Sequence, residues 1–483
     1  MKKTNILILI IIVLFTSCKK EQESTQNTEQ NFLNTAIESY LKDQKKIHEI
    51  PGFALAVIKN NKTIYKGYFG VENIETNKKV DASTIFPVFS VTKLIAATTI
   101  FKLIEEGKLT LEDTIGQYID DLPLTWQSVT IANLLTHSSG LPDFFYDNKE
   151  LTDNDMFSLI KQKELLFTQG NEWKYTQTNY WFLAKIIHKV TSVPFDSYVL
   201  NTQFENAKNP VFFSMDFKNR VKNRVLEYMY NNETNQQEAD EVLFKGKRGD
   251  AAGGLNISLD DFILWNQNFD KNSIINPTTK EKMWQPFKYN NPEDEFLHGW
   301  GLYNLNDTDS YGFTGGLKTG FRKFIKNDMT IIFLSNGFKY YPTHNIIIDH
   351  IAGMVDENLL DKGSLINEKL SNTFLKETTE KAILEFKKIK TANPNTNLES
   401  ALNRIGYVFL RSNSLEKAIT VFKLNTQEYP TSGNVFDSLG EAYFVSEMYK
   451  LSKENYKKSL VLDPKNENAK MMLEKIEKLT TKN

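Results

Sequence analysis

The chain has 483 residues, with 58 Lys and Arg against 60 Asp and Glu, so its formal net charge is −2. Balanced charge without a basic stripe argues against nucleic-acid binding, and the length suits two or three domains. One cysteine excludes an internal disulfide framework, and the six histidines lack the paired spacing of a metal site. The expected partner is therefore a small molecule or a peptide, and neither a metal nor an organic cofactor is required.

The N-terminus has the pattern of a lipoprotein signal peptide. A basic start precedes an apolar stretch from Ile6 to Phe15, which is too short to span a bilayer comfortably. Small residues then lead to Cys18 in a segment that resembles a bacterial lipoprotein cleavage box. We expect residues 1–17 to be a signal peptide, Cys18 to carry lipid, and the polar residues 18–31 to be a disordered tether. The alternative is a plain signal peptide or a short anchor helix.

This anchor predicts a location in the bacterial cell envelope. Lipid chains on Cys18 would tie the protein to a membrane without crossing it. The folded domains would then face the periplasm or the exterior.

Residues 32–360 alternate strand and helix patterns and form the main predicted domain. Residues 54–59 and 63–69 flank Asn60-Asn61 and predict a β-hairpin. Three further strands are expected near the end of the domain, over residues 310–316, 321–326 and 329–336. Helices in the middle and strands at both ends predict an α+β fold whose sheet joins the N- and C-terminal parts.

Ser90 opens the sequence Ser90-Val91-Thr92-Lys93, which precedes an apolar helical pattern over residues 94–104. This spacing places a hydroxyl and an amine on one helical turn, where a lysine activates a serine nucleophile. The same spacing recurs at Ser17, Ser39, Ser158 and Ser414. Only Ser90 follows a short extended apolar segment, residues 85–89, and leads into an apolar helix. The alternative interpretation is that Ser90 merely caps a core helix.

Residues 32–360 resemble the serine β-lactamase and penicillin-binding-protein superfamily, in its class C-like branch of D-aminopeptidases, D-Ala-D-Ala carboxypeptidases and esterases. Seven landmarks occur in the family's order. They are Pro51-Gly52-Phe53, the Ser90/Lys93 pair, Leu134 to Pro142, a tyrosine motif at Tyr175, Ala252 to Leu255, Gly299 to Leu302, and Gly312 to Gly316. The resemblance implies an antiparallel sheet with helices on its faces plus an all-helical lobe. It also implies that His137 and Trp300 hold loops rather than touch substrate.

The family's second motif is Tyr-x-Asn, and Tyr175-Thr176-Gln177 is the best match because an apolar helix follows it. Other such strings, at Tyr146, Tyr230 and Tyr289, lack that helix. By resemblance, Tyr175 shares the transfer of the serine proton with Lys93, and Gln177 helps to position the substrate's amide. Gln177 keeps the amide group of the usual asparagine on an arm longer by one methylene.

The third family motif, Lys-Thr-Gly or His-x-Gly, supplies a cation and an oxyanion-hole donor from the innermost strand. The matching stretch is Phe313-Thr314-Gly315-Gly316, with Phe313 in the place of the cation. The resemblance then makes the Gly316 N–H an oxyanion donor beside the Ser90 N–H. Lys318-Thr319-Gly320 spells the motif literally but is expected in the turn after the strand. From there Lys318 would return some positive charge to the site.

The C-terminal part repeats with the 34-residue period of tetratricopeptide repeats. Six pairs of positions share this offset: Ile405 and Leu439, Gly406 and Gly440, Phe409 and Tyr443, Ala418 and Ser452, Phe422 and Tyr456, and Pro430 and Pro464. After a polar helical linker over residues 361–395, residues 396–480 are expected to form two repeats and a capping helix. We expect the repeats to dock on the main domain or its linker, and a protein partner in their concave face is the alternative.

Together these features predict an envelope serine hydrolase that forms an acyl-enzyme on Ser90 with D-amino-acid peptides, β-lactams or esters. The alternative is a binding protein of the same fold that has lost catalysis and acts through its repeats. In that case Gln177 and Phe313 would be relics. Retention of Ser90, Lys93 and Tyr175 favours the enzyme.

Overall fold

The structure is a computed structural model that describes residues 28–144, 149–291, 293–340 and 343–480. The predicted signal peptide and Cys18 lie outside these residues. A helix covers residues 28–47, so the last four residues of the predicted disordered tether are helical. The reason is local and tertiary bonding: Gln30 Nε2 donates to Asn34 Oδ1 at 2.8 Å and to the Ile64 carbonyl at 3.2 Å. Within the described part of the chain, no helix is long and apolar enough to span a bilayer.

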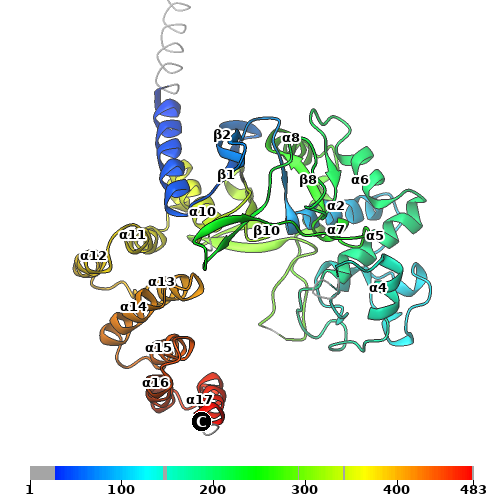
Figure 1. The fold of residues 1–483 in the computed structure, drawn as a ribbon. Coiled ribbons are helices and arrows are strands. Elements are labelled where there is room, and N and C mark those ends of the chain that lie inside the picture. Colours follow the sequence, from blue (N-terminus) through cyan, green and yellow to red (C-terminus); the bar gives the residue numbers. More distant parts are fainter. Residues whose placement is uncertain (1–27, 145–148, 292, 341–342, 481–483) are drawn as a thin grey trace, which may run out of the picture.

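A seven-stranded antiparallel sheet joins the two ends of the main domain, in the order β3-β2-β1-β12-β11-β10-β9 (Figure 1). Strand β1 (Gly52–Lys59) pairs with β2 (Lys62–Asn73), and the turn residues Asn60 and Asn61 both have positive φ, as a tight hairpin requires. The other neighbour of β1 is β12 (Met329–Ser335), which comes from the end of the domain. The predicted α+β fold, with a sheet that joins both ends, is confirmed.

The remaining strands complete this sheet and two smaller ones. The large sheet also contains β3 (Lys78–Lys79), β9 (Gly301–Leu305), β10 (Thr308–Gly315) and β11 (Thr319–Phe324). A three-stranded sheet contains β4 (Ile85–Pro87), β8 (Leu255–Ser258) and β5 (Phe212–Phe213), and a separate hairpin contains β6 (Tyr228–Asn231) and β7 (Gln236–Ala239).

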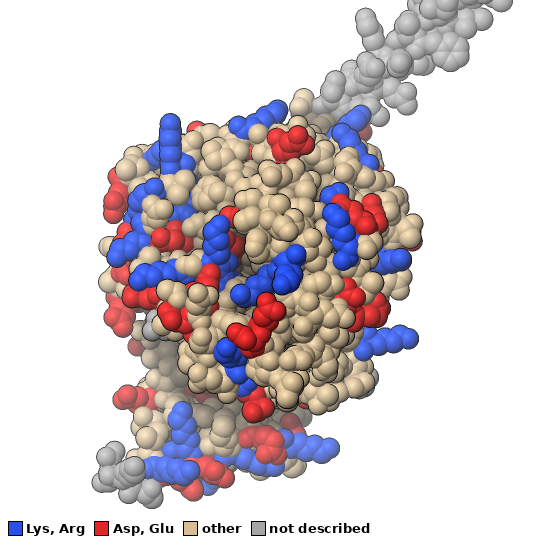
Figure 2. All heavy atoms as spheres, turned by 90° about the vertical axis from the view of Figure 1, so that its right-hand side faces the viewer, with Lys and Arg blue, Asp and Glu red and all other residues tan. Residues whose placement is uncertain are grey.

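Helices cover both faces of the large sheet and form the lobe beside it. They are α2 (Thr92–Glu105), α3 (Ile131–Leu135), α4 (Asp153–Ile160), α5 (Thr178–Thr191), α6 (Phe195–Gln203), α7 (Asp250–Gly253), α8 (Leu259–Asp270), α9 (Pro277–Met283) and α10 (Thr343–Val355). Ala54 and Ala56 of β1 face a core shared with α2 and the lobe, whereas Leu55 and Val57 face a second core shared with α10 and the N-terminal helix. This alternation is that of a strand covered on both faces. Acidic and basic side chains are interspersed over the face drawn in Figure 2.

The C-terminal part is an all-helical module, residues 362–480, which lies at the end of the sheet away from the lobe (Figure 1). Its helices are α11 (Lys362–Lys376), α12 (Thr379–Ala392), α13 (Glu399–Arg411), α14 (Leu415–Glu428), α15 (Gly433–Val445), α16 (Tyr449–Leu462) and α17 (Glu467–Thr480). Helices α15 and α16 begin and end 34 residues after α13 and α14. In both pairs a glycine admits an aromatic ring from the next helix, Gly406 against Phe422 and Gly440 against Tyr456. These helix pairs are consistent with tetratricopeptide repeats.

The predicted linker is a packed part of this module. Leu370 of α11 and Phe386 of α12 are buried in the same core as Leu402 and Phe422 of the repeats. On its other side, α11 is bonded to the main domain through Glu368, which accepts hydrogen bonds from Tyr40 Oη at 2.8 Å and from Gln44 Nε2 at 3.2 Å.

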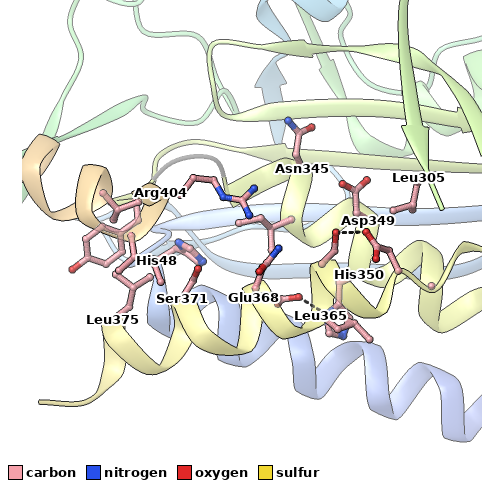
Figure 3. A pocket seen from close by; sticks show the side chains of 18 of the residues that line it. His48, Leu305, Asn345, Asp349, His350, Leu365, Glu368, Ser371, Leu375 and Arg404 are labelled. Carbon is pink, nitrogen blue, oxygen red and sulfur yellow. Dashed lines mark hydrogen bonds and ion pairs between the residues drawn. The ribbon is translucent and has the colours of Figure 1, made fainter. Parts of the chain in front are cut away.

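The contact between the two parts encloses a cavity of about 320 Å³, which Figure 3 shows from close by. Helices α10, α11 and α13 supply much of its lining. His350 Nδ1 lies 2.6 Å from Glu368 Oε2 at its edge, and Arg404 of α13 lines the opposite side. The helical module is therefore docked on the main domain by specific polar contacts.

Candidate active site

Ser90 lies at a sharp bend between β4 and α2, in a short 3-10 helix, η1 (Phe89–Val91). Phe89 has a φ of +47°, a left-handed conformation that costs energy for an aromatic residue and that is common at functional sites. Helix α2 has no side-chain cap at its N-terminus. Ser90 is thus not a side-chain cap of α2, and its hydroxyl points elsewhere.

Four of the predicted site residues meet at this bend. Tyr175 Oη donates a hydrogen bond to Ser90 Oγ at 2.8 Å. Lys93 Nζ donates to Gln177 Oε1 at 2.8 Å and to the Ala252 carbonyl at 2.5 Å. The same amine lies 4.9 Å from the centre of the Tyr175 ring. The serine, the tyrosine and the lysine therefore form one contiguous cluster.

The electrostatics of the cluster favour lysine as the base. Burial lowers the pKa of Lys93 to about 7, and the nearby Asp143 carboxylate opposes that shift. Burial raises the pKa of Tyr175 well above its usual value, although hydrogen bonds with Ser90 and Gln177 act in the other direction. Near neutral pH the amine is thus partly deprotonated while the phenol keeps its proton.

Gln177 occupies the N-terminus of α5, and Asp143 holds its backbone in place. Asp143 Oδ1 accepts a hydrogen bond from the Gln177 N–H at 2.9 Å. The longer glutamine arm reaches Lys93 from this position, so the amide still contacts the amine. Sequence reasoning did not assign roles to Asp143 or to the Ala252 carbonyl. Asp143 directly follows the landmark Leu134 to Pro142, and Ala252 opens another landmark, but only the folded chain brings them to Lys93.

His137 packs against the ring of Tyr175. It is fully buried, its ring centre is 4.5 Å from that of Tyr175, and its Nδ1 accepts a hydrogen bond from the Thr176 N–H at 3.3 Å. Burial, together with the charge of Lys93, lowers the pKa of His137 well below its usual value. This neutral histidine fits the predicted role of holding a loop. Trp300, likewise fully buried, stacks on Phe269.

The end of β10 lies against the segment from Val88 to Ser90. A Cβ at Gly315 would overlap the Val88 carbonyl oxygen and would lie 2.9 Å from Ser90 N, and a Cβ at Gly316 would lie 2.6 Å from the Phe89 ring. Gly316 also has a φ of +56°. Only glycines allow this approach, which brings the Gly315-Gly316 backbone beside the Ser90 amide as the oxyanion-hole prediction requires.

The residues on either side of Gly315 and Gly316 differ in polarity. The Phe313 ring is buried, 6.1 Å from Phe296 and 6.3 Å from Tyr175 between ring centres, so this side of the site is apolar. Thr314 is half-buried on β10. Lys318 lies in the turn, as expected, but its Nζ is 2.7 Å from Glu227 Oε2 in a buried ion pair. Its charge is therefore compensated by Glu227.

Comparison with known proteins identifies the class. A family model described as Beta-lactamase matches residues 37–353, and the chain belongs to this family. Penicillin-binding protein 4* of Bacillus subtilis (strain 168) is 26% identical over 314 residues, which are 60% of this chain and 68% of that protein. The helical module lies beyond the residues that the family model matches.

Two solved structures share the fold. The octameric penicillin-binding protein homologue from Pyrococcus abyssi has a TM-score of 0.57 at 23% identity, over 66% of this chain and 77% of that chain. The D-amino acid amidase from Ochrobactrum anthropi SV3, solved with D-phenylalanine, has a TM-score of 0.57 at 18% identity, over 67% of this chain and 99% of that chain. The β-lactamase-like fold of the main domain is thereby established, and family membership supports serine hydrolase activity in general.

Proposed function

We propose that this protein is a serine hydrolase that forms an acyl-enzyme on Ser90 with amide or ester substrates. The observation that carries the proposal is the hydrogen bond of 2.8 Å between Tyr175 Oη and Ser90 Oγ, beside a buried Lys93 with a pKa of about 7. A serine needs such a neighbouring base to become a nucleophile. Membership of the Beta-lactamase family supports the same chemistry.

In the proposed mechanism, Ser90 Oγ attacks the substrate carbonyl while its proton passes through Tyr175 Oη to the neutral Lys93 amine. The N–H groups of Ser90 and Gly316 stabilise the oxyanion. Collapse of the tetrahedral intermediate breaks the bond to the leaving group, which takes up the proton by the same route. Water then attacks the ester on Ser90 and regenerates the enzyme with release of the acid.

The substrate class we propose is D-amino-acid peptides or amides, β-lactams or esters. The printed names of the similar proteins, a penicillin-binding protein and a D-amino acid amidase, support this range. The apolar surroundings of Phe313 favour a leaving group without a carboxylate there. We further propose that lipid on Cys18 anchors the enzyme in the cell envelope.

The test is mass-spectrometric detection of an acyl or phosphonyl adduct after treatment with penicillin and a fluorophosphonate in parallel. We expect the fluorophosphonate adduct on the peptide that contains Ser90, and none in Ser90→Ala, whose thermal stability should stay close to that of the wild type. Labelling that persists in Ser90→Ala would place the nucleophile elsewhere. Absence of any adduct or ester turnover in the folded wild type would favour the binding protein.

A further inference from the structure

A second cavity, of about 410 Å³, opens beside the proposed oxyanion hole, and the helical module forms part of its wall. Phe89 and Gly316, the neighbours of the reacting groups, line one end. Val408 and Arg411 of α13 line another part. The end of α13 is held there because Asn232 Nδ2, next to β6, donates a hydrogen bond to the Arg411 carbonyl at 3.0 Å. Two parts of the chain that are far apart in sequence thus build one cavity.

The position of this cavity assigns it to the acyl side of the substrate. Tyr175, which returns the proton to the leaving group in the proposed mechanism, is not among its lining residues, and neither is Phe313. The centres of those two rings lie 6.3 Å apart, and Tyr175 Oη bonds to Ser90 Oγ from outside the cavity lining. A carbonyl held at the Gly316 N–H would therefore direct its leaving group toward Tyr175 and its acyl group into the cavity.

The lining is aromatic and apolar with a cationic part. Rings of Phe217, Tyr228 and Phe244 contribute to the walls. Two of the lining lysines are already paired, Lys318 with Glu227 and Lys339 with Glu49. Within the residues that the structure describes, Arg411 and Lys149 have no ion-pair partner, and Asp240 is the carboxylate that lines the cavity. Two unpaired cations against one carboxylate favour an anionic ligand.

We propose, on the basis of the function proposed above, that this cavity binds the acyl part of the substrate and selects an aromatic acyl group that carries a carboxylate at its far end. Arg411 is the residue that recognises the carboxylate, because guanidinium matches a carboxylate with two parallel hydrogen bonds. The helical module is then part of the substrate site, and it sets specificity as well as packing on the main domain.

The test compares two activated esters that differ only in charge: the mono-4-nitrophenyl ester of 1,4-phenylenediacetic acid and the same compound with its free carboxylate methylated. We expect the ratio of kcat/KM for the anionic over the neutral ester to fall about tenfold in Arg411→Met and by less in Arg411→Lys, which keeps the positive charge but loses the two parallel hydrogen bonds. Arg404→Met is the matched control, because Arg404 lies on the same helix but lines the other cavity (Figure 3). It should leave the ratio at the wild-type value.

An unchanged ratio in Arg411→Met, or an equal fall in Arg404→Met, would overturn the proposal. Binding of both esters to Ser90→Ala, measured by calorimetry, separates this proposal from the hydrolase proposal. If Ser90→Ala binds the anionic ester more tightly than the neutral one, and Arg411→Met in the same background removes this difference, the proposed role of the cavity is supported. This holds even if the wild type hydrolyses neither compound. Equal binding of the two esters overturns it, whatever the activity.

Discussion

Lys93 is the residue on which the proposed chemistry depends most, because the fold buries its amine completely and satisfies it with neutral groups. Its two acceptors are an amide oxygen of Gln177 and the Ala252 carbonyl, and neither carries a charge that would hold the proton. Desolvation therefore dominates its pKa. The serine beside it is half-buried and bonded to Tyr175.

This pKa predicts the pH dependence of the reaction. A lysine whose pKa is lowered to about 7 is protonated below that pH and neutral above it, so the form that accepts the serine proton increases as pH rises through about 7. We expect kcat/KM for a neutral ester to rise between pH 6 and 8 and then level off. Lys93→Met should lower kcat/KM by about a hundredfold or more. A flat profile over this range would remove Lys93 from the role of base.

Because Phe313 is apolar, we expect slow acylation by substrates that carry a carboxylate near the leaving group. Phe313→His should restore a cation at this place and raise the acylation rate constant for penicillin over that for a neutral ester by about fivefold, about 1 kcal/mol for a partly solvated pair. The two acylation rate constants are measured by stopped-flow or quenched-flow kinetics.

The matched control removes the Lys318–Glu227 pair as a unit. Lys318→Met combined with Glu227→Gln avoids leaving Glu227 buried without its partner. This double variant should keep the penicillin-to-ester ratio. If it abolishes penicillin acylation while Phe313→His changes nothing, Lys318-Thr319-Gly320 is the functional third motif.

At the scale of elements, the site depends on the contact between the end of β10 and η1. Thr319 Oγ1 shares its hydroxyl hydrogen between the Val88 and Gly315 carbonyls, at 3.0 and 3.1 Å, and so ties the start of β11 to the segment before Ser90. Gly315 lies so close to this segment that no side chain fits. The proposed oxyanion hole thus depends on two elements that are more than 200 residues apart.

Gly315→Ala should therefore impair both activity and stability. Its methyl group would push β10 away from η1 and displace the oxyanion donors, which we expect to cost about a hundredfold in kcat. Overpacking should lower the free energy of unfolding by about 1–3 kcal/mol. Gly107→Ala is the control for a methyl group added at a glycine without a steric clash, since Gly107 has open space around it; its φ of +68° makes it the more strained backbone position of the two. A variant Gly315→Ala with wild-type kcat would contradict the assigned oxyanion hole.

At the scale of the whole molecule, the N-terminal helix connects the main domain with the helical module. The N-terminal helix packs on α10 through Ile37 and Leu41, and Glu368 of α11 joins that helix to the helical module. The residues that precede the helix contain the predicted lipid anchor. The proposed membrane attachment would thus reach the fold at the start of this helix, where Gln30 bonds to the Ile64 carbonyl, and the helix leads from there to the contacts with α11 at Tyr40 and Gln44.

Replacing Cys18 with alanine tests the anchor. Without a thiol the chain cannot receive lipid, so we expect Cys18→Ala to move from the membrane fraction to the soluble envelope fraction or the medium. Cell fractionation followed by intact-mass measurement reports both location and modification. The folded domains should keep their ester hydrolysis, which serves as the control for folding. A variant that stays in the membrane at an unchanged mass would instead indicate an uncleaved helix anchor.

The sequence alone was sufficient for those features that depend on local pattern. The Asn60-Asn61 turn, the three strands near residue 330 and the 34-residue offset of the helix pairs follow from turn chemistry and periodicity, which act over short stretches of chain. The ordered motifs also indicated the family and the Ser90, Lys93 and Tyr175 candidates. Motif order survives in the sequence because each motif occupies consecutive residues.

Only the tertiary structure decided which groups compensate one another across the chain. Three examples involve distant segments: Asp143 accepts a hydrogen bond from the Gln177 N–H, Glu227 pairs with Lys318, and Arg411 lines the same cavity as Gly316. No local pattern encodes them, since burial and electrostatic pairing depend on which surfaces the completed fold brings together. For the same reason, the polar residues 361–395, which the sequence predicts to be a linker, form a packed helix pair. Leu370 and Phe386 are buried there by the repeats that follow later in the chain.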